Sequence, residues 1–171
     1  LSVINTSGEI LFAAHSERYS KVKHDSKIHQ GLLSEVLDHW PIDHVAYYEQ
    51  PWKKQLRRIR SGERIEWSKL TTEQILKDQF GSHATIPNYS CHNHHLSHAA
   101  AGFQTSPFTY ATVVVIDAIG EADTISIYRA RYNPDGRAEY TQLWKQTYPH
   151  SIGLFYSAMT EHCGLMPMEE E

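Results

Sequence analysis

The chain has 171 residues, of which 40% are hydrophobic and 21% are charged, and its formal net charge is −4. This length suffices for one domain with a hydrophobic core, and the composition is that of an ordinary soluble domain. The negative charge gives no reason to expect binding to nucleic acid or to anionic membranes, and no apolar run approaches the ~20 residues that a membrane-spanning helix needs.

The expected strands and helices are mixed along the chain, which predicts an α/β fold. A turn signal at 133–136, Asn-Pro-Asp-Gly, joins two of the strands, and Pro41, Gly81 and Gly164 each end a helix. The expected strands are 2–4, 9–15, 44–48, 110–116, 124–132 and 139–148, and the expected helices are 32–40, 71–80, 93–104 and 151–163. The strand at 110–116 is continuously apolar and β-branched, so we expect it to be buried on both faces.

The two ends and the two cysteines suggest the context of the chain. It opens on Leu1 and stops inside an acidic run at 169–171, so we interpret it as a fragment of a longer protein. Cys91 and Cys163 follow no disulfide pattern, which indicates a reducing compartment and a cytoplasmic location.

A basic amphipathic stretch runs from Trp52 to Arg60. Leu56 and Ile59 offer an apolar face, and the basic residues surround it. We interpret the stretch as a solvated helix face, because most runs of charge are solvated; contact with a membrane or with RNA is the alternative.

Four of the twelve histidines lie within the seven residues 92–98. On a helix, His94 and His98 are one turn apart, with their Cβ atoms about 5–6 Å from each other, so both imidazoles can face one point and bind a transition metal. His95 points elsewhere. A histidine cluster without metal is the alternative, and a zinc-protease motif is excluded because His95 stands where that motif needs a glutamate.

Asp117 follows His98 by nineteen residues, at the predicted carboxyl end of the buried strand. There its carboxylate can be a third ligand, and two histidines with one carboxylate leave open positions on iron or zinc. The alternative is that Asp117 only opens a turn. In the same turn, backbone N–H groups at Gly120 and Glu121 can cradle a phosphate, although a plain hairpin turn would also explain the glycine.

A charged segment follows the first predicted hairpin, with Glu17-Arg18-Tyr19 and then Lys21-Val22-Lys23-His24-Asp25. Lysine and arginine bind phosphate and carboxylate groups well. A solvated loop is the alternative interpretation.

Four motifs together resemble the amino-terminal part of the O-carbamoyltransferases, which include nodulation-factor, aminoglycoside and cephalosporin carbamoyltransferases. The motifs are Glu17–Tyr19 with Lys23–Asp25, His94–Ala100, Asp117–Glu121 and Ser151–Tyr156. The resemblance implies an actin/hexokinase-type (ribonuclease H-like) lobe with a mixed sheet flanked by helices. The lobe would be incomplete, with residues 1–171 forming the amino-terminal part of a carbamoyltransferase domain.

The resemblance also implies a reaction and the residues that carry it. A second domain would use ATP and carbamoyl phosphate to make carbamoyl-adenylate, and this lobe would pass the carbamoyl group to a hydroxyl of a small-molecule acceptor. His94, His98 and Asp117 would hold a divalent metal, iron above zinc or manganese. Lys23 would be catalytic and would contact the carbamoyl-adenylate, while Gly120 and Glu121 would lie at the nucleotide phosphate.

One position departs from the family pattern, which usually has Asp-Gly where this chain has Asp117-Ala118. The catalytic base and a fourth metal ligand would lie outside this fragment, so the chain should be inactive by itself. Transfer of a threonylcarbamoyl group to tRNA and a non-catalytic metal- or nucleotide-binding module are the alternative functions. We expect no membrane or nucleic-acid partner, and a homo-oligomer stays open.

Overall fold

The computed structural model describes residues 1–23, 25–81 and 88–167, which form two compact units. The first unit consists of Leu1–Ala46 and Thr72–Ser90, and the second of Tyr47–Thr71 and Cys91–Glu171. Helices and strands are present in both, so the predicted α/β class is confirmed. None of the described helices is long and apolar enough to span a bilayer.

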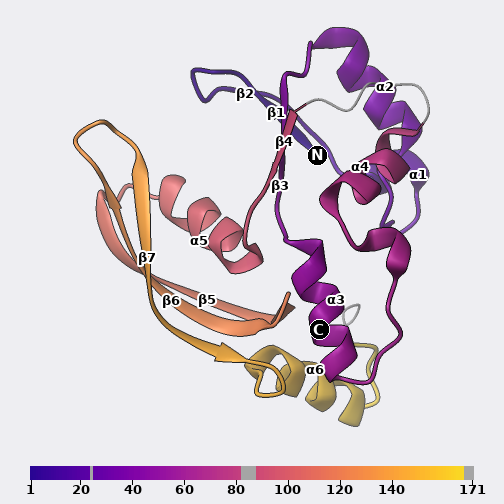
Figure 1. The fold of residues 1–171 in the computed structure, drawn as a ribbon, viewed down its shortest axis with the longest axis vertical. Coiled ribbons are helices and arrows are strands. Elements are labelled where there is room, and N and C mark those ends of the chain that lie inside the picture. Colours follow the sequence, from indigo (N-terminus) through magenta and orange to yellow (C-terminus); the bar gives the residue numbers. More distant parts are fainter. Residues whose placement is uncertain (24, 82–87, 168–171) are drawn as a thin grey trace. The chain divides into compact units, whose positions relative to one another are not determined.

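The first unit combines paired short strands with helices (Figure 1). Its buried apolar residues lie mainly on two of the helices. Strands β1 and β2 form an antiparallel hairpin, and β3 pairs with β4. The elements are β1 (Ser2–Ile4), β2 (Ile10–Ala13), α1 (Glu17–Ser20), α2 (Gln30–His39), β3 (His44–Tyr47), α4 (Thr72–Phe80) and β4 (Asn88–Cys91). The buried apolar side chains are Val3, Leu32, Leu33, Val36, Ile75, Leu76 and Phe80.

The second unit is built on a three-stranded sheet of order β5-β6-β7. Helix α5 lies against one face of this sheet, and α6 contacts β5 (Figure 1). The elements are α3 (Pro51–Arg60), the 3-10 helix η1 (Trp67–Lys69), α5 (His94–Gln104), β5 (Tyr110–Gly120), β6 (Asp123–Tyr132), β7 (Ala138–Thr147) and α6 (Ile152–His162). Ala99 of α5 is buried with Val115 and Tyr128 of the sheet, and this cluster joins helix to sheet.

The sheet differs from the prediction in direction and in burial. Both of its ladders, β5 with β6 and β6 with β7, are antiparallel, so this sheet is not of mixed direction. Val115 is 6% exposed, whereas its neighbours Val114 and Ile116 are 55% and 57% exposed. The prediction that this strand is buried on both faces is therefore wrong, because α5 covers one face and the side chains of a strand alternate between faces.

Strand β5 is also longer than predicted. It continues past Ile116 to Gly120 through an irregular stretch where its register with β6 shifts, and the turn follows at Glu121 and Ala122. Asp117 therefore lies within the strand, not in a turn that closes it. The rule that ligands gather at the carboxyl ends of parallel strands does not apply to this antiparallel sheet.

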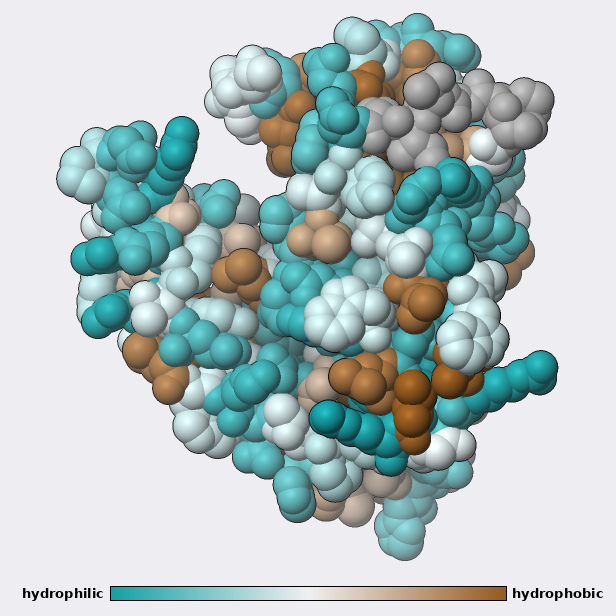
Figure 2. All heavy atoms as spheres, viewed as in Figure 1, coloured by the Kyte–Doolittle hydropathy of each residue, from teal (hydrophilic) through white to brown (hydrophobic). Residues whose placement is uncertain are grey.

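The basic stretch forms helix α3, as predicted. The prediction placed its basic side chains in solvent, but two apolar side chains are exposed and two of the arginines are half-buried. Leu56 and Ile59 are exposed, and apolar atoms are visible on the surface over this helix (Figure 2). Arg57 and Arg58 are half-buried and paired with Glu63 and Glu66. Arg57 and Arg58 are thus engaged in ion pairs of this unit rather than free in solvent, whereas Arg60 is exposed.

Candidate metal centre

Helix α5 begins at a position that brings two histidines to one face. Asn93 has extended backbone angles, and its side-chain oxygen accepts the backbone N–H of Leu96 at 3.0 Å. This N-cap fixes His94 as the first helical residue. His98 then follows one turn later, so the two imidazoles lie side by side.

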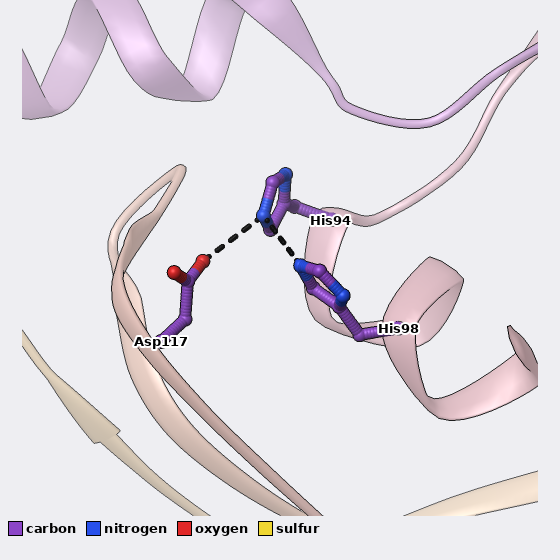
Figure 3. Close-up of side chains that lie close together, drawn as sticks. All are labelled: His94, His98 and Asp117. Carbon is purple, nitrogen blue, oxygen red and sulfur yellow. Dashed lines mark hydrogen bonds and ion pairs between the residues drawn. The ribbon is translucent and has the colours of Figure 1, made fainter. Parts of the chain in front are cut away.

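The side chains of His94, His98 and Asp117 converge, as the sequence predicts (Figure 3). The Nε2 atoms of the two histidines are 3.0 Å apart, and the Nε2 atom of His94 is also 3.0 Å from Oδ2 of Asp117. One ligand atom from each residue lies within 4.8 Å of the other two. Two imidazole nitrogens and one carboxylate oxygen at this spacing form a donor set that suits a transition metal.

The contacts around His94 place one ring nitrogen between two partners. Its Nε2 atom carries either one hydrogen or one lone pair, yet it approaches both the carboxylate of Asp117 and Nε2 of His98. A hydrogen on this atom would be divided between the two partners, whereas a lone pair there would face the carboxylate. A cation shared by the three atoms makes a direct contact with each of them, so the residues fit a metal.

Asp117 is held in the charged form that a metal ligand needs. The hydrogen bond with His94 lowers the pKa of its carboxyl group, and the backbone N–H of Ala118, which donates to Oδ1 at 2.7 Å, acts in the same direction. Strand alternation places Asp117 on the same face of β5 as Val113 and Val115, which face α5. The sequence thus gives Asp117 the same face as the two valines, whereas which face of the strand α5 covers is decided by the packing of the helix on the sheet.

His95 points away from the cluster, as predicted. Its side chain is fully buried, and its Nδ1 atom lies 2.8 Å from Oγ of Ser126. Burial lowers the pKa of this imidazole, which keeps it neutral. We infer that His95 supports the start of α5 rather than binding the metal.

Gly120 lies directly against the two histidine rings. A Cβ atom at this position would be 2.4 Å from Cδ2 of His94 and 2.6 Å from Cδ2 of His95. Only glycine leaves room for the imidazoles to pack on the backbone here. The predicted contact of Gly120 with a nucleotide phosphate stays a prediction.

Glu121 lies in the turn after β5 with its carboxylate directed inward. The side chain is buried, and it accepts the backbone N–H of Gln50 at 2.6 Å and the side-chain amide of Asn93 at 3.1 Å. Burial raises the pKa of this carboxyl group, while the hydrogen bond from Gln50 and the charge of Lys53 oppose the rise. Its predicted place at the nucleotide phosphate also stays a prediction.

The start of α6 supports the backbone of the same segment, and sequence reasoning assigned it no role of its own. Ser151 caps α6 by accepting the N–H of Leu154 at 3.0 Å and donates to the carbonyl of Ala118 at 2.7 Å. A Cβ atom on Gly153 would lie 2.7 Å from the backbone of Ala118, so α6 can approach β5 this closely only at a glycine. Ser151 before a helix is a cap signal, which gives no indication of a contact with β5.

Lys23 is not part of the group formed by His94, His98 and Asp117. It is an exposed residue of the first unit, and the three metal-binding candidates all belong to the second. His24, from the same motif, lies outside the described residues. The predicted contact of Lys23 with carbamoyl-adenylate therefore stays a prediction.

Comparison with known proteins identifies the family. The model of the carbamoyltransferase N-terminus matches residues 64–171. The chain belongs to this family. The matched residues include the three candidate metal ligands His94, His98 and Asp117, whereas Lys23 precedes the matched range.

Two of three relatives extend the similarity of this carbamoyltransferase-family chain to nearly its whole length. It is 32% identical to an uncharacterized protein of Synechocystis sp. over 92% of the chain, and 28% identical to an uncharacterized protein of Methanocaldococcus jannaschii over 95% of it. It is also 28% identical to the nodulation protein NolNO of Sinorhizobium fredii over 70% of the chain. The chain spans 29%, 28% and 19% of the lengths of these relatives, respectively.

Proposed function

We propose that this chain supplies the metal-binding part of an O-carbamoyltransferase, which passes a carbamoyl group from carbamoyl phosphate, through carbamoyl-adenylate, to a hydroxyl of a small-molecule acceptor. The observation that carries the proposal is the convergence of His94, His98 and Asp117 within a carbamoyltransferase-family chain. In this proposal the chain is part of an actin/hexokinase-type, ribonuclease H-like lobe in a cytoplasmic enzyme. The net charge of −4 favours a small-molecule acceptor over tRNA.

His94, His98 and Asp117 would hold the metal, with iron proposed ahead of zinc and manganese. A metal bound there would supply Lewis-acid polarisation of a carbamoyl or phosphate oxygen. Transfer forms a bond between the acceptor oxygen and the carbamoyl carbon and breaks the bond between that carbon and the adenylate, which leaves as AMP. A base outside this chain would accept the hydroxyl proton of the acceptor.

Two further groups have roles in the proposal. Lys23 offsets the negative charge that grows on the leaving phosphate, because an ammonium group stabilises charge that develops in the transition state. The backbone N–H groups at Gly120 and Glu121 lie at the nucleotide phosphate, since a carboxylate directed inward leaves only the backbone of the turn for an anion.

The test uses the full-length protein and its His94→Ala and His98→Ala variants, with His162→Ala as the control because His162 is an exposed histidine at the end of α6. Elemental analysis gives the metal content. Incubation with carbamoyl phosphate, ATP and a panel of alcohols, followed by mass spectrometry, gives the carbamoylated product. We expect the two site variants to lose metal and transfer activity, and the control to keep both.

Two results would overturn the proposal. Stoichiometric metal and full transfer activity in both site variants would remove the metal assignment. Threonylcarbamoylation of tRNA, without any carbamoylated small molecule, would replace the acceptor class with tRNA.

A further inference from the structure

Two carboxylates of one short segment hold opposite ends of His94. Oδ2 of Asp117 lies 3.0 Å from the ring nitrogen Nε2, and Oε1 of Glu121 accepts the backbone N–H of the same histidine at 3.3 Å. The residues are four positions apart, with Gly120 packed against the imidazole between them. The segment therefore holds both the backbone N–H and the imidazole ring of His94 in place.

The carboxylate of Glu121 is fully engaged inside the unit. Glu121 is 3% exposed; Oε1 also accepts the N–H of Gln50, and Oε2 accepts from the side chain of Asn93 and lies 3.8 Å from Nζ of Lys53. Gln50 precedes α3 and Asn93 precedes α5, so this one carboxylate lies at the positively polarised amino-terminal ends of two helices. A side chain with these partners ties the turn to both helices.

The backbone of Glu121 adopts a conformation that costs free energy. Its φ angle is +59°, a left-handed conformation that residues other than glycine rarely adopt. Such a conformation persists where surrounding contacts impose it, as they do around a functional site. Here the contacts that impose it are those that hold the start of α5.

We propose that Glu121 is a positioning residue of the metal site: its buried carboxylate holds the first turn of α5 so that His94 faces Asp117, and metal affinity depends on it although it does not touch the metal. The inference rests on the proposed metal site. It gives Glu121 a role beyond the predicted phosphate contact, which the backbone of the turn can make without the carboxylate.

The test compares Glu121→Gln and Glu121→Ala with the wild type in the full-length protein. Glutamine keeps the shape but turns an amide donor toward the amide of Asn93 and the ammonium of Lys53. We expect Co²⁺, titrated against a competing chelator, to bind about tenfold or more weakly, the loss typical of a missing outer-shell partner. The visible absorption bands of bound Co²⁺ should change as well, because the ligands shift. Glu139→Gln is the control, since Glu139 pairs with Arg131 on an exposed hairpin, and we expect it to bind as wild type does.

A role limited to stability would lower the melting temperature and leave both the affinity and the spectrum of the folded protein unchanged. Asn93→Ser is a second variant that tests the same inference. Serine can keep the cap on Leu96 while the hydrogen bond to Glu121 is lost. We expect Co²⁺ to bind about threefold or more weakly to this variant. Wild-type affinity and spectrum in folded Glu121→Gln overturn the inference. If that variant does not fold, wild-type affinity in Asn93→Ser overturns it. Absence of Co²⁺ binding in the wild type would instead contradict the proposed function.

Discussion

The start of α5 and the charged segment that contains Lys23 carry the two halves of the proposed chemistry, and they are built differently. The metal-binding candidates of α5 and β5 are fixed by buried neighbours, among them His95, Glu121 and the backbone at Gly120. Lys23 follows the four-residue helix α1 and is exposed. Side chains that share a cation need to be held in position before the cation binds. A charged side chain that contacts only the substrate can remain on the surface.

The largest effect on folding should come from the core of the first unit. Leu32 is 0% exposed, so Leu32→Ala should reduce the free energy of unfolding by about 2–5 kcal/mol, as measured by urea denaturation. Metal affinity, measured where the variant is folded, should not change, because all three ligand candidates belong to the second unit. A parallel loss of affinity would show that the two regions are not independent.

Gly120→Ala should affect folding and metal binding together. The added methyl group meets both histidine rings, and overpacking of this kind costs about 3 kcal/mol. Displacement of His94 should also weaken metal binding about tenfold. Gly102→Ala on α5 is the matched control, because nothing lies within 4 Å of its Cβ and alanine favours a helix by up to about 1 kcal/mol. Equal behaviour of the two variants in urea denaturation and metal titration would contradict the packing argument.

Ser126→Ala should have a smaller effect. It removes the partner of the buried Nδ1 atom of His95, at a cost of about 1 kcal/mol in the free energy of unfolding. Because His95 supports the first turn of α5, we also expect this helix to open locally more often, which would appear as faster hydrogen exchange of its amides than in the wild type. Unchanged exchange would remove His95 from the support of the site.

Lys23→Ala should have the smallest effect on folding, with an unchanged melting temperature and unchanged metal affinity. In the proposed reaction it should still lower kcat by about 100-fold, because charge on the leaving phosphate would no longer be offset. Lys27→Ala, four residues further along the chain, is the control, and the ion pair of Lys27 with Asp78 at 3.7 Å is exposed. Equal transfer rates in the two variants would take Lys23 out of the chemistry.

Local patterns predicted most of the elements and the side chains that meet at the start of α5. The helical spacing of His94 and His98 is a property of neighbouring residues, and α5 has the expected bounds within one residue. The burial of β5 was predicted wrongly, because a run of valines is compatible with a strand covered on one face or on two. Which of these occurs depends on what packs against the sheet.

The sequence by itself determined the α/β class, the pair of histidines one turn apart and the resemblance that the family match supports. Only the tertiary structure decided that Asp117 turns toward α5, that Gly120 lets the imidazoles rest on the backbone, and that the carboxylate of Glu121 faces inward. The physical reason is range: helix periodicity acts over four residues, whereas these contacts join residues about 25 positions apart through burial and hydrogen bonds that no local pattern encodes.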